Sequence, residues 1–434
     1  MRCYGVPKST DPETYLRLAC ERTLLSVDSG NGMPGAFEGA VISRVLGAAG
    51  TLPAQVGLDI LDEYQLAMVL RDGRRGRMLM HRQAMAQVPR QRLSVQRVVV
   101  GDRDFDHGKD RWALERLIFA DDVCHLSLSG AEPAGASRSA RRAMTMARVA
   151  PGGRPNQPNP ATLVLADDVG TTATARAGHA SWGGGSWSAT YTTDKALSAN
   201  TQWIELDGIR LDLPERTPEP AFHVENVEPI EPLRRVLYAE ILSTDRRHGG
   251  ADTVEIACRA LIATGAFNED DPTLGELRRI ADAVTNATPA PGLPEPWASL
   301  VARYSINDGV IGSIPIGVAI DDLEGFSIRI DALISEPTSF SIALAMSPGL
   351  PLLRHFPGAI DLEPSAITWW AEDDRGNSYV AFPDRGGGGG NVAEGQVTSL
   401  ASLDPKATEL TLMPTGTRSR GVIAVPLTSL ARRS

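Results

Sequence analysis

Two pairs of adjacent aspartates are the residues whose types and spacing first suggest chemistry. They occur in Asp167–Gly170 and Asp373–Gly376, which share the order acid, acid, any residue, glycine. Paired carboxylates can bind a metal ion or serve as an acid and a base. The same order suits a hairpin turn, where Asp accepts backbone N–H bonds and Gly adopts a positive φ. Adjacent strand residues point to opposite faces, so we predict turns here rather than a shared ligand site.

Three alternating aspartates form a weaker candidate metal site. They are Asp102, Asp104 and Asp106, and their order resembles the start of a calcium-binding loop. The EF-hand pattern needs glycine at the sixth position and an acid at the twelfth. This sequence has His107 and Ala113 at those positions. We therefore predict a solvated connection between strands, and we expect no metal and no other cofactor.

Two glycine runs and two tryptophans could take part in binding. Gly183–Gly185 and Gly386–Gly390 could cradle phosphate only if they led into the N-terminus of a helix. Strand-like residues follow both runs, so we predict hairpin tips. Trp182 and Trp187 flank the first run and are candidate partner-binding residues, because an aromatic ring at a loop tip can stack on a partner. Burial at the edge of the sheet is the alternative.

Catalytic motifs give no support to an enzyme. The histidines are scattered, without an H-x-x-x-H pair, and the sequence has no G-x-S-x-G nucleophile elbow. We assign no catalytic residue, and the sequence leans against an enzyme without deciding the question. Cys3, Cys20, Cys124 and Cys258 are far apart and form no C-x-x-C motif, which indicates reduced, buried thiols and a cytoplasmic protein.

The strongest charge feature is the stretch from Arg71 to Arg97. It predicts either an anion-binding face or a solvated helix face paired with acidic residues of the same chain. The net charge of −10 favours a protein partner, which could be acidic, over nucleic acid. The candidate partner-binding arginines are Arg71, Arg74, Arg75, Arg77 and Arg82.

The elements that must position these residues fall into alternating helical and strand-rich segments. The chain has 434 residues, of which 42% are hydrophobic, so about two to four globular domains are expected. No apolar run long enough for a membrane span occurs, and Met1–Gly5 opens no secretory signal, so no membrane partner is expected. The predicted segments are 1–91 (helical), 92–214 (strands), 215–232 (a Pro-rich linker), 233–305 (helical) and 306–434 (strands).

Self-comparison indicates an internal duplication. Similar segments recur in the same order and at a nearly constant spacing, with one slip inside the loop 131–160. The matched segments are Ile42–Gly50 with Ala257–Gly265, Gly101 with Gly317, Leu126–Leu128 with Ile342–Leu344, Asp167–Gly170 with Asp373–Gly376, and Ile204–Leu206 with Leu410–Leu412. We predict a multidomain α+β protein of two diverged repeats. Each would be a helical segment followed by an antiparallel immunoglobulin-like β-sandwich of about seven short strands.

The C-terminal segment also resembles a known kind of domain. Ile367–Leu427 combines the turn after Trp369-Trp370, the run Gly386–Gly390, and Leu403-Asp404-Pro405 followed by Leu410-Thr411-Leu412. In these features it resembles a β-sandwich found in uncharacterised actinobacterial proteins. The resemblance implies a fold and no activity.

The sequence favours a non-enzymatic interaction or scaffold protein. It would act through the loops of the sandwiches and the arginine-rich face. The main alternative is an enzyme or small-ligand-binding protein with a site in the cleft between the two halves. Nucleic-acid binding through Arg71–Arg97 is a weaker alternative, and the oligomeric state stays open.

Overall fold

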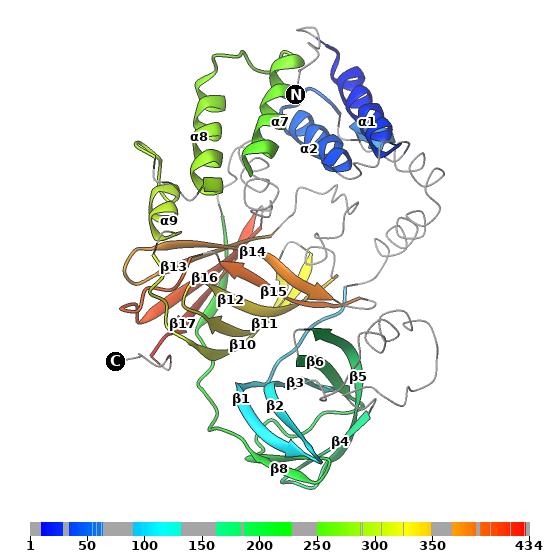
Figure 1. The fold of residues 1–434 in the computed structure, drawn as a ribbon, viewed down its shortest axis with the longest axis vertical. Coiled ribbons are helices and arrows are strands. Elements are labelled where there is room, and N and C mark those ends of the chain that lie inside the picture. Colours follow the sequence, from blue (N-terminus) through cyan, green and yellow to red (C-terminus); the bar gives the residue numbers. More distant parts are fainter. Residues whose placement is uncertain are drawn as a thin grey trace.

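The computed structural model shows a mostly antiparallel β protein with helices at one end (Figure 1). The structure describes residues 10–28, 34–63, 90–131, 162–183, 186–227, 250–286, 290–348, 367–387 and 391–430, with single positions left out of some ranges, and residue 288. Within these residues, no helix is long and apolar enough to span a membrane. The predicted loop 131–160 lies almost wholly outside them.

Helices arise where the sequence predicts helical segments, and the structure gives the bounds of five of them. They are α1 (Pro12–Asp28), α2 (Pro34–Ala48), α7 (Gly250–Ala263), α8 (Pro272–Asn286) and α9 (Trp297–Tyr304). Asp11 caps the start of helix α1, because its carboxylate accepts the backbone N–H of Thr14 at 2.9 Å. Helices α2 and α7 end alike, on Gly50 and Gly265 with φ values of 71° and 73°. A positive φ at this position is the usual helix stop, since glycine adopts it without steric cost.

Eight strands of the first half form one continuous sheet. They are β1 (Arg97–His107), β2 (Asp110–Phe119), β3 (Cys124–Ala131), β4 (Thr162–Asp167), β5 (Thr172–Gly183), β6 (Ser186–Thr193), β7 (Trp203–Leu206) and β8 (Ile209–Asp212). The order across the sheet is β1-β2-β3-β6-β5-β4-β7-β8. In β4 and β6 buried and less buried residues alternate, as expected when one face of a strand covers a core.

Nine strands form the second sheet. They are β9 (Phe222–Asn226), β10 (Gly312–Leu323), β11 (Phe326–Ser335), β12 (Phe340–Ser347), β13 (Thr368–Asp373), β14 (Ser378–Gly387), β15 (Ala393–Ser399), β16 (Glu409–Thr415) and β17 (Ser419–Pro426). The order is β10-β11-β12-β15-β14-β13-β16-β17-β9. Except for β9, this repeats the order of the first sheet strand by strand. Strand β9 lies within 215–232, where we predicted a linker, and it forms the edge of the second sheet.

The two sheets also share their irregularities. Both first hairpins contain a β-bulge at a glycine of positive φ, Gly101 in β1 and Gly317 in β10. Two further register shifts fall at corresponding strand pairs, β2–β3 with β11–β12 and β5–β6 with β14–β15. Bulges bend a strand and increase its twist, so the shared positions give both sheets a similar curl.

The continuous strand order differs from the predicted immunoglobulin-like arrangement, which divides its strands between two separate facing sheets. The first sheet curls instead into a barrel-like form, and inward side chains from all its strands meet in one core. The two edge strands β1 and β8 come close to each other. The Arg103 side chain of β1 donates a hydrogen bond to the Asp212 carbonyl of β8. Alternation along each strand predicted the buried face but not how the strands would pair.

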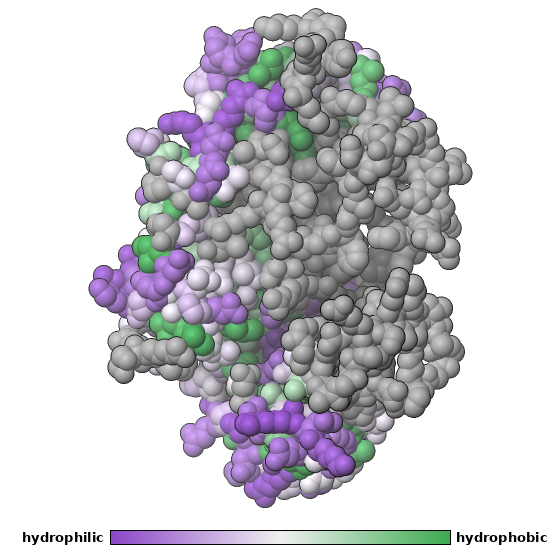
Figure 2. All heavy atoms as spheres, in the orientation of Figure 1, coloured by the Kyte–Doolittle hydropathy of each residue, from purple (hydrophilic) through white to green (hydrophobic). Residues whose placement is uncertain are grey.

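The helices of both halves pack against one another, α1 on α2, α2 on α7, α7 on α8 and α8 on α9, and α9 packs on β14 of the second sheet. Side chains of α1, α2, α7, α8 and α9 join one hydrophobic core with the inward residues of β10 to β17. Figure 1 shows this arrangement, with the helices above the second sheet and the first sheet at the lower end. Hydrophilic side chains dominate the lower end of the first sheet on the face in Figure 2.

The halves touch through the segment that enters the first sheet. The N–H groups of Gln91 and Leu93 donate to the hydroxyls of Ser347 and Ser327, at 2.7 and 2.9 Å. Both serines are fully buried. Residues 90–93 therefore run along the outer face of β11 and β12, and both faces of β11 are buried.

Candidate functional site

Both aspartate pairs lie in hairpin turns of the same geometry, as predicted. Gly170 and Gly376 have φ values of 89° and 81°, and each N–H donates to the carbonyl of the first aspartate of its pair. Asp167 and Asp373 are buried, and one carboxylate oxygen of each accepts the N–H groups two and four residues later. Each first aspartate therefore holds the turn from inside.

The second aspartate of each pair makes different bonds. The Asp168 carboxylate accepts the Thr201 hydroxyl at 2.6 Å and the Gln202 N–H at 2.7 Å. The Asp374 carboxylate accepts the hydroxyl and the N–H of Thr408 at 2.6 and 3.0 Å. These hydrogen bonds keep the pKa of Asp168 and Asp374 below the ordinary value. Because adjacent carboxylates bond to separate partners, neither pair forms a joint acid and base.

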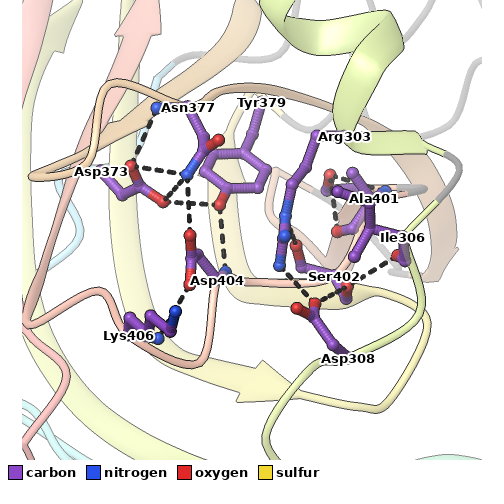
Figure 3. A network of polar contacts seen from close by, with 11 residues as sticks. Arg303, Ile306, Asp308, Asp373, Asn377, Tyr379, Ala401, Ser402, Asp404 and Lys406 are labelled. Carbon is purple, nitrogen blue, oxygen red and sulfur yellow. Dashed lines mark hydrogen bonds and ion pairs between the residues drawn. The ribbon is translucent and has the colours of Figure 1, made fainter.

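Asp373 is also the centre of a buried polar network (Figure 3). Its carboxylate accepts the Tyr379 hydroxyl at 2.7 Å and the Asn377 side-chain amide at 2.9 and 3.1 Å. The Tyr379 oxygen accepts the N–H of Asp404 at 3.2 Å. Burial, and then the bond to Asp373, raise the pKa of Tyr379, so its hydroxyl stays protonated and donates. The network joins β13, β14 and the loop before β16, which is a structural task.

A second part of this network ties α9 to the sheet. The buried Arg303 guanidinium donates to the Ser402 carbonyl at 3.0 Å and to the Asp308 carboxylate at 2.6 Å. Ser402 in turn donates to the Ile306 carbonyl at 3.0 Å. Charge-assisted bonds of this kind are stronger than neutral ones, so Arg303 fixes the end of α9 against the loop 401–404.

Of the three alternating aspartates, the structure describes the side chains of Asp104 and Asp106. Asp104 forms an ion pair with Arg111 of the neighbouring strand at 2.5 Å, and Asp106 is exposed. Asp102 lies on β1, and its side chain is outside the described residues. In the part of the chain that the structure describes, no three His, Cys, Asp or Glu side chains cluster closely enough to hold a metal ion.

Trp187 belongs to the core of the first sheet and not to a loop tip. It is almost fully buried, and its ring lies edge-on to Trp112 with centroids 5.1 Å apart. The backbone of Trp182 pairs with Trp187 across the β5–β6 hairpin, and its side chain is outside the described residues. An aromatic ring on the inward face of a strand buries a large apolar area, which explains why Trp187 takes the core position.

Most of the arginine-rich stretch lies outside the described residues, including Arg71, Arg74, Arg75, Arg77 and Arg82. Its last three arginines are described and have partners within the chain. Arg90 and Arg92 pair with Asp322 and Asp321 of the second half at 3.0 Å, and Arg97 is buried. The Arg97 guanidinium donates to the carbonyls of Ala199, Thr201 and Pro214. Arg97 therefore supports the fold, whereas Arg90 and Arg92 form exposed ion pairs with the second half.

The described cysteines are consistent with unreactive thiols. Cys20, Cys124 and Cys258 are free and buried. Burial raises the pKa of Cys124, and it raises that of Cys258 to about 11. A thiol needs its thiolate form to attack or to bind a metal, so neither group is a nucleophile near neutral pH.

Sequence reasoning missed one cluster of charged side chains between the halves. Arg329 and Asp331 lie on the outer face of β11, and each side chain is 2% exposed. They form an ion pair at 2.8 Å, and Glu394 of β15 lies 3.6 Å from the second guanidinium nitrogen. His125 of the first sheet lies 3.5 Å from Glu394. Arg329 Nη2 has no hydrogen-bond partner among the described residues.

Burial and the charges of neighbouring side chains determine the protonation states of Arg329 and His125. Burial lowers the pKa of Arg329, but Asp331 and Glu394 more than offset this, so its pKa is raised and it stays charged. Burial, and then Arg329, lower the pKa of His125. The only signal in the sequence was an arginine and an aspartate within the apolar run of β11. The alternation of apolar and polar residues along β11 could not show that another segment would cover the outer face of this strand.

The lowered pKa of His125 predicts that stability falls in mild acid. Unfolded His125 binds a proton near its ordinary pKa of 6.5, whereas the folded ring resists protonation beside Arg329 and Arg116, despite Glu394 and Asp331. The unfolded state therefore binds more protons, and the free energy of unfolding decreases as the pH falls below 6.5. Urea unfolding between neutral pH and about pH 5 measures this. His125→Gln should reduce the slope, and equal slopes would contradict the assignment.

A small pocket also lies between the halves. Gln96, Arg97, Arg216 and Gly317 are among its lining residues, and it encloses about 20 Å³. That volume suits a single water molecule and is far below that of a ligand pocket. The pocket adds no support for a substrate site.

Fold and site together define a mostly antiparallel β protein whose described polar clusters hold the structure together. The sequence matches no protein-family model and no curated protein. A solved structure found by comparison is the crystal structure of a conserved domain protein from Bacillus anthracis. It has 9% sequence identity over 73% of this chain and 77% of that chain, and its TM-score is 0.16. A TM-score this low supports neither a shared fold nor a shared function. The resemblance to actinobacterial proteins stays a prediction.

Proposed function

We propose that this protein is a non-enzymatic interaction or scaffold protein built from two diverged copies of one unit. Each copy would comprise a helical segment followed by a curled antiparallel sheet. The shared strand order, the shared bulges and the matching ends of α2 and α7 support the duplication. After a duplication, the residues that the fold requires stay similar in the two copies, whereas exposed residues change.

One observation carries the proposed function. The turns Asp167–Gly170 and Asp373–Gly376 share their backbone bonds, yet the residue at the tip differs, Val169 in one and Arg375 in the other. Val169 is 68% exposed. A buried aspartate thus holds a turn that presents an apolar side chain to solvent. An exposed apolar side chain on a rigid turn suits contact with a partner, because little conformational entropy is lost on binding.

The polar side chains support the same proposal by contrast. Asp167, Asp373 and Arg303 each bond to groups of the same chain. Catalytic groups instead need to converge on a point that a substrate can reach. The arginine-rich face remains part of the proposal, with an acidic protein as its partner.

Partner capture by the immobilised chain tests this function. Val169→Asp should remove specific partners by placing a charge in an apolar contact, and Arg74, Arg75 and Arg77 changed together to Glu should remove acidic ones. Leu18→Asp is the matched control, because it places the same charge at another exposed apolar position, on α1. A capture profile unchanged by both test variants would refute the proposal. Circular dichroism should show all variants folded.

A small-ligand or enzymatic site between the halves is the second candidate. The cluster of Arg329, Asp331, Glu394 and His125 speaks for it, because perturbed ionisable groups often mark functional sites. The pocket of about 20 Å³ is too small for a ligand, so it does not support this candidate. Nucleic-acid binding through Arg71–Arg97 ranks third, since Arg90, Arg92 and Arg97 are paired within the chain.

A further inference from the structure

Strand β9 has one edge paired and one edge open. The Ala221 carbonyl accepts the N–H of Ala424, and the Val227 N–H donates to the Arg418 carbonyl, so the odd-numbered residues of this stretch face β17. Backbone groups alternate along a strand, so the N–H and C=O of Phe222, Val224 and Asn226 point away from β17. Strand β9 ends the order of the second sheet, and no described strand pairs with its outer edge.

The open edge carries exposed apolar side chains. Phe222 and Val224 are 46% and 45% exposed. They stand opposite Ile423 and Gly421 of β17, which are buried, so they share the face that covers the core. Strand β10 packs against that face at Gly421, where a Cβ atom would lie 2.8 Å from Ile320 Cδ1. Strand β9 therefore extends beyond the core, and its apolar face is only partly covered.

Charged side chains occupy the other face of β9. Glu225 accepts a hydrogen bond from Arg420 of β17, and His223 Nε2 lies 3.5 Å from Glu225 Oε2. The His223 side chain is largely exposed. An open edge with an apolar stripe favours pairing with another strand, and proteins usually block such edges. The residues of β9 indicate which kind of strand could pair with its open edge.

Antiparallel pairing of β9 with itself satisfies both the backbone and the side chains. Only registers that place even-numbered residues opposite even-numbered residues join the outward N–H and C=O groups. A twofold axis at Val224 puts His223 opposite Glu225 of the other copy. It also brings Phe222 and Val224 of both copies into one apolar stripe. An axis at Glu225 would set two glutamates against each other, and an axis at His223 would lose the opposite-charge pair.

We propose that a second copy of this chain binds to the open edge of β9, in antiparallel register about Val224. The occupant follows from the self-complementary order Phe222-His223-Val224-Glu225-Asn226. The two second sheets then form one continuous sheet across the twofold axis, as in other isologous contacts. This surface is separate from the Val169 turn and the arginine-rich stretch, so it goes beyond the proposed function.

Sedimentation velocity of the full chain over a range of concentrations tests the dimer. Wild type should dimerise. Val224→Pro removes an outward N–H donor while leaving the bonds to β17, and Val224→Lys places like charges together at the axis. Each should raise the dimer Kd by at least about tenfold. Val164→Lys is the control, since Val164 is equally exposed but lies on β4, an interior strand. It should dimerise like wild type.

A cysteine at the axis tests the register. Paired residues at this position have Cα atoms about 5.5 Å apart, within the range of a disulfide. Val224→Cys should therefore form a covalent dimer under mild oxidation. Phe222→Cys should not, because residue 222 faces residue 226 of the other copy. Wild type reports the background from its own four cysteines.

Three results would overturn the proposal. One is a monomer at every concentration, and if that monomer binds a different protein through β9, the edge belongs to that partner. Another is a dimer that Val224→Pro leaves unchanged, and the third is a dimer in which Val224→Cys fails to crosslink. None of these outcomes depends on Val169 or the arginine-rich face.

Discussion

Asp331→Ala will lower the free energy of unfolding by about 3 to 5 kcal/mol. The Arg329 guanidinium is 2% exposed and pairs with Asp331 at 2.8 Å. Without Asp331 its nearest carboxylate is Glu394 at 3.6 Å, so a buried charge is left poorly compensated. A loss of this size is a large part of the stability of an ordinary domain. Urea unfolding monitored by tryptophan fluorescence measures it.

Two further variants separate the charge effect from simple loss of packing. Asp212→Ala breaks the exposed pair with Arg210 and should change stability by less than about 1 kcal/mol. Arg329→Met combined with Asp331→Ala should recover part of the loss, because it removes the uncompensated charge. If Asp331→Ala costs no more than Asp212→Ala, the buried pair does not stabilise the folded protein.

Asp373→Ala and Asp167→Ala will each lower the free energy of unfolding by about 2 to 4 kcal/mol. Removal of the Asp373 carboxylate leaves the N–H groups of Arg375 and Asn377 and the Tyr379 hydroxyl without their acceptor. Removal of Asp167 does the same to the N–H groups of its own turn and of Ser198. Buried donors without a partner cost more than the hydrogen bond itself contributes.

Matched variants test whether the two turns play the same role. Asp374→Ala should cost clearly less than Asp373→Ala, because Asp374 is exposed and water can replace its carboxylate. Tyr379→Phe removes one bond to Asp373 and the acceptor of the Asp404 N–H, and should cost about 1 to 2 kcal/mol. A loss below about 1 kcal/mol for either Asp167→Ala or Asp373→Ala would show that its turn does not need the buried carboxylate.

Turns and helix ends were predictable because their causes are local. Asp and Gly at fixed spacing determine a hairpin turn through bonds within five residues, and the structure has those bonds at Asp167 and Asp373. The start of α1 has an equally local cause, since the Asp11 carboxylate accepts the N–H of Thr14 three residues later. The curled sheet was not predictable in the same way. Strand order depends on pairings between residues far apart in sequence, and the turn motifs do not encode them.

The sequence predicted the local positions of the candidate partner-binding residues but not their burial. Trp187 and Trp182 flank a hairpin tip, as expected, but the face to which Trp187 points decided its burial against Trp112. Arg97 belongs to an arginine-rich stretch, yet its position on β1 puts it among the carbonyls of Ala199 and Thr201. A charge pattern in sequence cannot distinguish an exposed face from one that another segment covers.

The sequence by itself determined the local features of this protein: the turns, the helix stops, the alternation of the strands and the order of the matched segments. Only the tertiary structure decided that β9 would join the second sheet, and that Arg329 and Asp331 would be buried beneath the first half. The reason is physical. Periodicity shows which side chains share a face, whereas burial depends on what packs against that face, and here segments distant in the chain supply it.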